Sequence, residues 1–327
     1  MSTSTSNNTD DTFGNIDISI PPTIRFWLLL VLDIPAALCS LFLLYHLLLK
    51  RDLRQALHNH VVIVLLFVLL SVLLIDIPSY IVVLSTGYVW LAFPWFCNVW
   101  SFVTVGLFDM IAILMALGSM ERHILVFHSA WMNSTRKCFL FHYLPLILVT
   151  FYGVVFYIWV IFFPSCNNIY DYSQPWCGDP CYYDQQTVSN YDLIVNAYIP
   201  MLTIVIFNVG LIVRQIRQKK RIDQIIQWHK HRKMIVQMLS VCCLYLIFYL
   251  PCLISAFISH LGFLDNFLIE LIPVLYFNTY FIPLLMPYVV LASLPNFWQK
   301  WAITKRMKTQ NRVSLVTATV ATMKRPF

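Results

Sequence analysis

The chain has 327 residues and a formal net charge of +7, and 59% of its residues are hydrophobic while only 11% are charged. This composition excludes an ordinary water-soluble domain, because so few charges suit a chain that is surrounded mainly by lipid. The positive charge does not indicate nucleic-acid binding either, since the basic residues form no basic domain. All Lys and Arg residues except Arg25 and Arg122 lie in the ranges 50–54, 136–137, 214–233 and 300–325. The loops between the other apolar stretches carry acids but no Lys or Arg, as the positive-inside rule predicts for a chain that crosses a membrane several times.

Seven apolar stretches are each long enough to cross about 30 Å of hydrocarbon as a helix. They cover residues 23–49, 58–84, 94–127, 139–163, 191–218, 232–260 and 267–293. We therefore predict an all-α membrane protein whose residues 23–293 form one seven-helix transmembrane domain. The basic segments follow the odd-numbered spans, which predicts a multi-pass membrane protein with its amino terminus outside. We expect it in the plasma membrane.

The two ends of the chain differ in character. Residues 1–22 are mostly polar, and we expect an extracellular tail that is glycosylated at the sequon of Asn7. Residues 294–308 combine aromatic and basic side chains, which predicts a short amphipathic eighth helix in the inner interface of the bilayer. Residues 309–327 are then a cytoplasmic tail.

The third apolar stretch carries the strongest motif. Cys97 stands at its outer end and the triplet Glu121-Arg122-His123 at its inner end. A helix from Cys97 to Arg122 would be about 37 Å long, which places the two residues at opposite membrane faces. A charged pair at that depth is costly enough to indicate a function.

This arrangement resembles the rhodopsin-like G-protein-coupled receptors, whose third helix runs from a disulfide cysteine to an Asp/Glu-Arg-Tyr triplet. Further marks of the resemblance are Trp90, Pro200, Pro251, Pro287 and Phe297. The resemblance implies that Glu121, Arg122 and His123 couple to a heterotrimeric G protein, and that arrestin binds the phosphorylated tail. It also implies an activation switch formed by Pro200, Tyr249, Pro251 and Pro287.

Four cysteines fall on the outer side, where an oxidising environment favours disulfides and permits three different pairings. They are Cys97, Cys166, Cys177 and Cys181. The resemblance implies that Cys97 pairs with Cys181, because the distance from Cys181 to Pro200 is similar to that in the family. Cys166 and Cys177 would then form the second pair.

Several departures mark a divergent member of the family. Tyr249 stands where the family's sixth helix has a tryptophan, and Met286 stands where its seventh helix has an asparagine. The buried aspartate of the family's second helix is replaced by Leu69 or Leu70. Because sodium needs several oxygen ligands, we expect no sodium site there.

The acids within the spans are the main indication of a ligand. No lysine occurs in residues 234–299, which excludes retinal bound as a Schiff base, and Thr104 replaces the aspartate that receives amines in aminergic members. Acids within or at the ends of spans are often parts of ligand or ion routes. We predict a negative pocket for a basic peptide or other cation, formed by Asp76, Thr104, Phe108, Asp109, Asp192, Tyr249, Tyr276 and Tyr280. The alternative is that Asp33, Asp76, Asp109 and Asp192 simply form hydrogen bonds with neighbouring side chains.

A seven-helix ion channel or transporter is the alternative function, because the same acids could form an ion path. Enzyme activity finds no support in the sequence, which has no phosphate-binding glycine loop, no nucleophile with a spaced base and no clustered metal ligands. We therefore expect no cofactor and no metal site. The expected partners are an extracellular ligand, a G protein, arrestin and the lipid bilayer, and not a nucleic acid.

Overall fold

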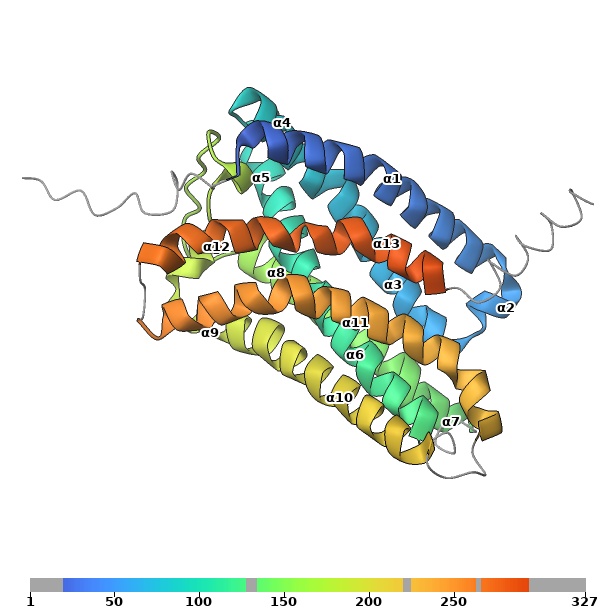
Figure 1. Ribbon diagram of the computed structural model, residues 1–327. Coiled ribbons are helices and arrows are strands. Elements are labelled where there is room, and N and C mark those ends of the chain that lie inside the picture. The colour runs from blue at the N-terminus through green and yellow to red at the C-terminus, as the bar shows by residue number, and fades with distance from the viewer. Residues whose placement is uncertain (1–19, 128–133, 220–224, 263–265, 294–327) are drawn as a thin grey trace, which may run out of the picture.

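Seven helical spans run side by side in the computed structural model, which describes residues 20–127, 134–219, 225–262 and 266–293 (Figure 1). They are Pro22–Leu49, Asn59–Thr86, Pro94–Leu125, Thr135–Phe162, Gln186–Arg214, Leu239–His260 and Ile269–Ala292. Within the described ranges the elements are helices without strands, so the prediction of an all-α seven-helix bundle is confirmed. The predicted eighth helix, the sequon at Asn7 and the cytoplasmic tail lie outside the described residues.

Most spans are divided into successive helical elements. The first is α1 (Pro22–Leu49), which α2 (Arg51–Arg54) follows. The second comprises α3 (Leu57–Ser71), η1 (Val72–Asp76) and α4 (Ile77–Thr86), and the third α5 (Pro94–Ser101), η2 (Phe102–Leu107) and α6 (Phe108–Phe127). The fourth comprises α7 (Thr135–Cys138), η4 (Phe139–Tyr143) and α8 (Leu144–Phe162), and the fifth α9 (Gln186–Tyr191), η7 (Asp192–Tyr198) and α10 (Ile199–Lys219). The sixth lies in α11 (Ile225–His260), and the seventh is α12 (Asn266–Thr279) with α13 (Phe281–Ser293).

Three spans contain a widened π-helical turn just before a proline. The turns η1, η4 and η7 end two residues before Pro78, Pro145 and Pro200, respectively. Proline has no N–H group and its ring pushes away the carbonyl four residues earlier, so the regular hydrogen-bond pattern cannot continue. A wider turn accommodates this change, and such turns often occur at functional sites. Each of the three contains a polar residue that recurs below: Asp76, His142 and Asp192.

The third span lies at the centre of the bundle, where α6 packs against α3, α8, α10 and α11. Its side chains Met110, Ile111 and Leu114 have almost no exposed surface and belong to the main apolar core. Large apolar side chains on the other helices, such as Phe151 on α8 and Ile206 on α10, point outward and are exposed. This outward apolar surface is what a bundle surrounded by lipid requires.

The loop between α8 and α9 is held by two disulfides. We call the end of the bundle that carries this loop the outer end and the opposite end the inner end, following the orientation that the sequence predicts. Cys97 bonds to Cys177, with Cα atoms 5.7 Å apart, and Cys166 bonds to Cys181, with Cα atoms 6.0 Å apart. The prediction that the outer cysteines form disulfides is therefore confirmed. The predicted pairing of Cys97 with Cys181 and of Cys166 with Cys177 is wrong.

The fold of the loop explains the observed pairing. The N–H of Asp171 donates to the carbonyl of Cys177, so the chain turns back and places Cys177 at the outer end of α5. The side chain of Asn168 accepts a hydrogen bond from the N–H of Cys181, which holds Cys181 near Cys166. Distance along the chain could not distinguish Cys177 from Cys181, because only three residues separate them.

Candidate functional site

One tyrosine joins two carboxyl groups in the outer half of the bundle. The Tyr157 hydroxyl of α8 lies 2.8 Å from Oδ2 of Asp109 on α6 and 2.7 Å from Oδ1 of Asp192 in η7. Tyr157 has no exposed surface. It can approach the third span closely because Gly106 has no side chain, and a Cβ atom there would lie 2.7 Å from the tyrosine ring. The predicted site residues Asp109 and Asp192, on the third and fifth spans, are thus brought together by Tyr157 of the fourth span.

The hydrogen count in this group has a direct consequence. A phenol has one hydrogen, so the Tyr157 hydroxyl can donate to only one of the two acids. Both contacts are short enough to be hydrogen bonds, so the other acid must donate to the phenol oxygen. The pair of carboxyl groups therefore holds one proton. Asp192 is buried and accepts two more hydrogen bonds, from Tyr182 at 2.9 Å and Asn196 at 2.7 Å.

Tyr249 connects this group to the sixth span. Its hydroxyl donates to Oδ1 of Asp109 at 3.1 Å, and its ring lies 5.6 Å from the ring of Phe108. Pro251 follows two residues later inside α11. Asp109 is therefore hydrogen-bonded directly to the segment of α11 that contains the proline.

Asp76 belongs to a second polar group, nearer to the first and seventh spans. Its Oδ1 atom accepts hydrogen bonds from Trp100 and Thr104, both at 2.8 Å. Asp33 on α1 is also buried, and its Oδ1 atom has no hydrogen-bond partner among the described residues. Thr104, which the sequence predicts to line the pocket, thus donates its hydroxyl hydrogen to Asp76.

An aromatic stack closes the outer end of this second group. The Tyr80 ring lies parallel to the rings of Tyr280 and of Trp176 in the loop between α8 and α9, at 5.3 Å and 5.7 Å. Arg25 of α1 donates to the Tyr80 hydroxyl at 2.9 Å and is buried. Arg25 thus places a positive charge beside the second group, in a region that the sequence predicts to be negative.

The predicted pocket residues therefore fall into two groups of contacting side chains rather than one. Phe108, Asp109, Asp192 and Tyr249 belong to the first, and Asp76, Thr104 and Tyr280 to the second. Tyr276 belongs to neither and exposes 52% of its surface. The hydrogen bonds to neighbouring side chains that the alternative expects are present for Asp76, Asp109 and Asp192.

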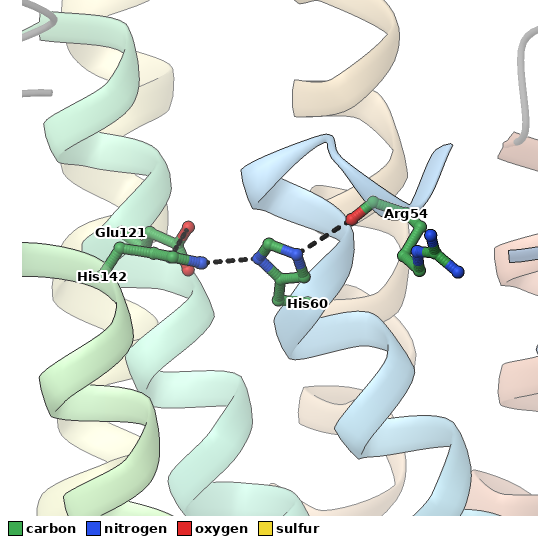
Figure 2. A network of polar contacts seen from close by, with 4 residues as sticks. All are labelled: Arg54, His60, Glu121 and His142. Carbon is green, nitrogen blue, oxygen red and sulfur yellow. Dashed lines mark hydrogen bonds and ion pairs between the residues drawn. The ribbon is translucent and has the colours of Figure 1, made fainter. Parts of the chain in front are cut away.

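The inner end of the bundle contains a chain of polar contacts through two histidines (Figure 2). Oε1 of Glu121 on α6 lies 2.6 Å from Nδ1 of His142 in η4, which is within the distance of an ion pair. The two groups are not oriented for a straight hydrogen bond. Nε2 of His142 lies 2.8 Å from Nδ1 of His60 on α3. Nε2 of His60 donates in turn to the carbonyl of Arg54 at 2.9 Å.

The other two residues of the triplet face different surroundings. Arg122 is buried, with 3% of its surface exposed. The His123 ring packs against Phe127 on its own helix and against Phe207 on α10. One turn outward, Asn208 of α10 donates to Ser119 at 3.0 Å, which joins the third and fifth spans. Glu121 thus contacts the fourth span, whereas His123 contacts the fifth span.

The neighbourhood where the resemblance would place sodium ligands is apolar. Leu69 and Met286 have no exposed surface and belong to the main core, and Leu70 packs against it. These side chains offer no oxygen atom to a cation. This environment supports the expectation that no sodium ion binds there.

The sequence did not single out Tyr157, Tyr182, His142 or the inward role of His60. The only local indication was the prolines, because Pro145 and Pro200 each follow a widened helical turn by two residues and so indicate where a helix widens. No local pattern distinguishes Tyr157 among the 17 tyrosines of the chain. These residues acquire partners only when different spans pack together.

No protein-family model and no curated protein matches this chain. Among solved structures, the crystal structure of squid rhodopsin matches with a TM-score of 0.62. The match covers 88% of this chain and 87% of that chain, at 15% sequence identity. With seven membrane-length helices and a disulfide at the outer end of the third, the chain has the fold of the rhodopsin-like G-protein-coupled receptors.

Proposed function

We propose that this protein is a G-protein-coupled receptor that converts the binding of an extracellular cation, such as a basic peptide, into activation of a heterotrimeric G protein. The observation that carries the proposal is the position of Asp109 and Arg122 on one helix, α6. Their interval corresponds to about 20 Å along the helix axis, so one lies in the outer half of the bundle and the other at its inner end. Buried ionisable groups within a membrane are energetically costly, so their presence at both positions indicates a function.

The ligand class follows from the acid pair at Tyr157. Asp109 and Asp192 hold one proton between them, and Asp109 is only partly buried. A positively charged group that reached Asp109 could replace the proton and form a charge-assisted hydrogen bond. Asp171 in the outer loop adds negative charge, because the hydroxyl and N–H of Ser173 hold the pKa of its carboxyl below the ordinary value. Such charge attracts cations to the mouth of the bundle.

Transmission inward would use Tyr249. A ligand that binds the Asp109 oxygen would break its hydrogen bond with the Tyr249 hydroxyl and so release α11 from α6 close to Pro251. Movement of α11 would then expose the surface around Arg122 to the G protein. The outside location of the amino terminus, its glycosylation at Asn7, residence in the plasma membrane and recruitment of arrestin are parts of the same proposal.

Nucleotide exchange on a purified G protein tests the proposal. Receptor reconstituted in vesicles should accelerate exchange, and Arg122→Ala should abolish the acceleration while surface expression remains. Arg51→Ala is the matched control, since Arg51 is an exposed arginine at the same end of the bundle. Full acceleration by Arg122→Ala would refute this coupling mechanism. Ion flux through the vesicles that needs no G protein would favour the channel or transporter instead.

A further inference from the structure

The contacts of Glu121 determine how its charge is neutralised. Glu121 and His142 are buried, with 4% and 2% of their surfaces exposed. A buried carboxylate needs a counter-charge or several hydrogen bonds. The family resemblance alone would suggest Arg122 for this role. In this chain, however, the carboxylate oxygen lies against a histidine of the fourth span.

The histidine chain itself can supply the counter-charge. The carbonyl of Arg54 only accepts hydrogen bonds, so Nε2 of His60 must carry a hydrogen. The nitrogens of His60 and His142 that face each other at 2.8 Å need one hydrogen between them. The 2.6 Å contact of His142 with Glu121 needs another, because two bare lone pairs would repel each other.

Three contacts therefore need three hydrogens, whereas two neutral imidazoles carry two in total. The third hydrogen is an added proton, and with it the net charge of Glu121, His142 and His60 is zero. Imidazole is more basic than a carboxylate, so the added proton belongs to the histidine pair.

The surroundings are consistent with this balance. The Tyr143 ring packs on His142 and His60 at 4.7 Å and 5.4 Å, and so covers both imidazoles. Among the nearby basic side chains on α2 and α7, the guanidinium of Arg54 donates to the carbonyl of Leu48 instead. Among the described basic residues of these elements and α6, Arg51, Arg136 and Lys137 are exposed and Arg122 is buried.

We propose that His142 and His60 are positioning residues for G-protein coupling, which share one proton with Glu121 and hold this acid against the second and fourth spans. The role rests on the proposed receptor function. When the shared proton is present, Arg122 is not needed to neutralise Glu121. When it is lost, the charge of Glu121 acts on Arg122, with which it already interacts electrostatically, and restrains it in the resting state. Coupling therefore decreases as the pH at the inner face rises.

The pH profile of ligand-independent nucleotide exchange tests the coupling role. In vesicles whose inner-face pH is varied from about 6 to about 8, exchange by the unmodified protein should fall as the pH rises, by at most about tenfold per pH unit for one proton. His142→Gln keeps an amide that can donate to Glu121 but cannot carry the proton, so its profile should be flat and low. Glu121→Gln removes the charge, so its profile should be flat and high. The matched control is His46→Gln, at the inner end of α1 and outside the network, which should keep the normal profile. A normal profile in His142→Gln would overturn the coupling role.

A second measurement tests the proton without a G protein. Nitrogen-15 NMR of histidine-labelled protein distinguishes ring nitrogens with and without hydrogen. Subtraction of the His142→Gln and His60→Gln spectra should assign three N–H groups to the two rings at pH 6, and two in Glu121→Gln. Two N–H groups in the unmodified protein would overturn the shared proton. If exchange were absent at every pH, the receptor function and the coupling role would fall together, whereas the NMR result would still decide the shared proton.

Discussion

The Tyr157 hydroxyl lies between two acids of different spans, 2.8 Å from Asp109 and 2.7 Å from Asp192. This contact joins the third, fourth and fifth spans at one oxygen atom. Because one phenol hydrogen cannot serve both acids, the contact also fixes one proton in the outer half of the bundle. The fold and the charge state of the candidate ligand site are thus connected through a single side chain.

Removal of that hydroxyl should destabilise the bundle. Tyr157→Phe leaves the two acid oxygens without their shared partner, and the loss of a partner for a buried polar group costs about 1–3 kcal/mol. Thermal unfolding of the purified protein in detergent measures the effect. Tyr45→Phe is the control, because Tyr45 is exposed on α1 and should be neutral. Equal stability of both variants would show that the bridge contributes nothing.

The acid pair should set the affinity for a cationic agonist. Asp109→Asn preserves the shape of the side chain and removes its charge, which should weaken binding by about 1.5–3 kcal/mol, the range of hydrogen bonds to charged groups. In dose–response curves this corresponds to a loss of potency of roughly ten- to a hundredfold. Asp192→Asn should act in the same direction. Unchanged potency in both surface-expressed variants would rule out the cationic ligand.

Agonist potency should also depend on the pH outside the cell. A cation that binds Asp109 replaces the proton shared through Tyr157, so binding releases a proton and is favoured as pH rises. The potency should therefore increase from acidic to neutral pH, by at most about tenfold per unit for one proton. Asp109→Asn has no proton to release and should show a flat dependence. A proton-independent potency in the unmodified receptor would mean that the ligand leaves the acid pair intact.

The sequence predicted the spans well because hydropathy is a property of each span alone. The stretch predicted at 94–127 contains the observed span Pro94–Leu125. Contacts between spans were less accessible, since partners such as His60 and His142 lie 82 positions apart in the chain. The cysteine pairing was wrong for a related reason, because the turn at Asn168 that selects it depends on a side-chain contact.

Peptide mapping without reduction should recover Cys97 linked to Cys177 and Cys166 linked to Cys181. Cys177→Ser should expose a free thiol at Cys97 and weaken folding of the outer half, because this bond ties the loop to the third span. Cys166→Ser should have the smaller effect, since its bond closes a loop within residues 166–181. Recovery of a peptide that links Cys97 to Cys181 would contradict the observed fold of the loop.

Sodium should affect neither ligand binding nor basal exchange. Leu69 and Met286 are completely buried among apolar side chains, and a sodium ion needs several oxygen ligands that they lack. Leu69→Asp alone should not create a site, because one carboxylate supplies too few ligands. The measurement replaces sodium by choline at constant ionic strength, so that general screening of charges stays the same. A sodium effect that persists in Asp76→Asn would contradict the predicted absence of a site near Leu69. A sodium effect that Asp76→Asn abolishes would also contradict the prediction, and would place the ion beside Asp33 and Asp76. Both acids are buried, and among the described residues no lysine or arginine is hydrogen-bonded to either carboxyl group.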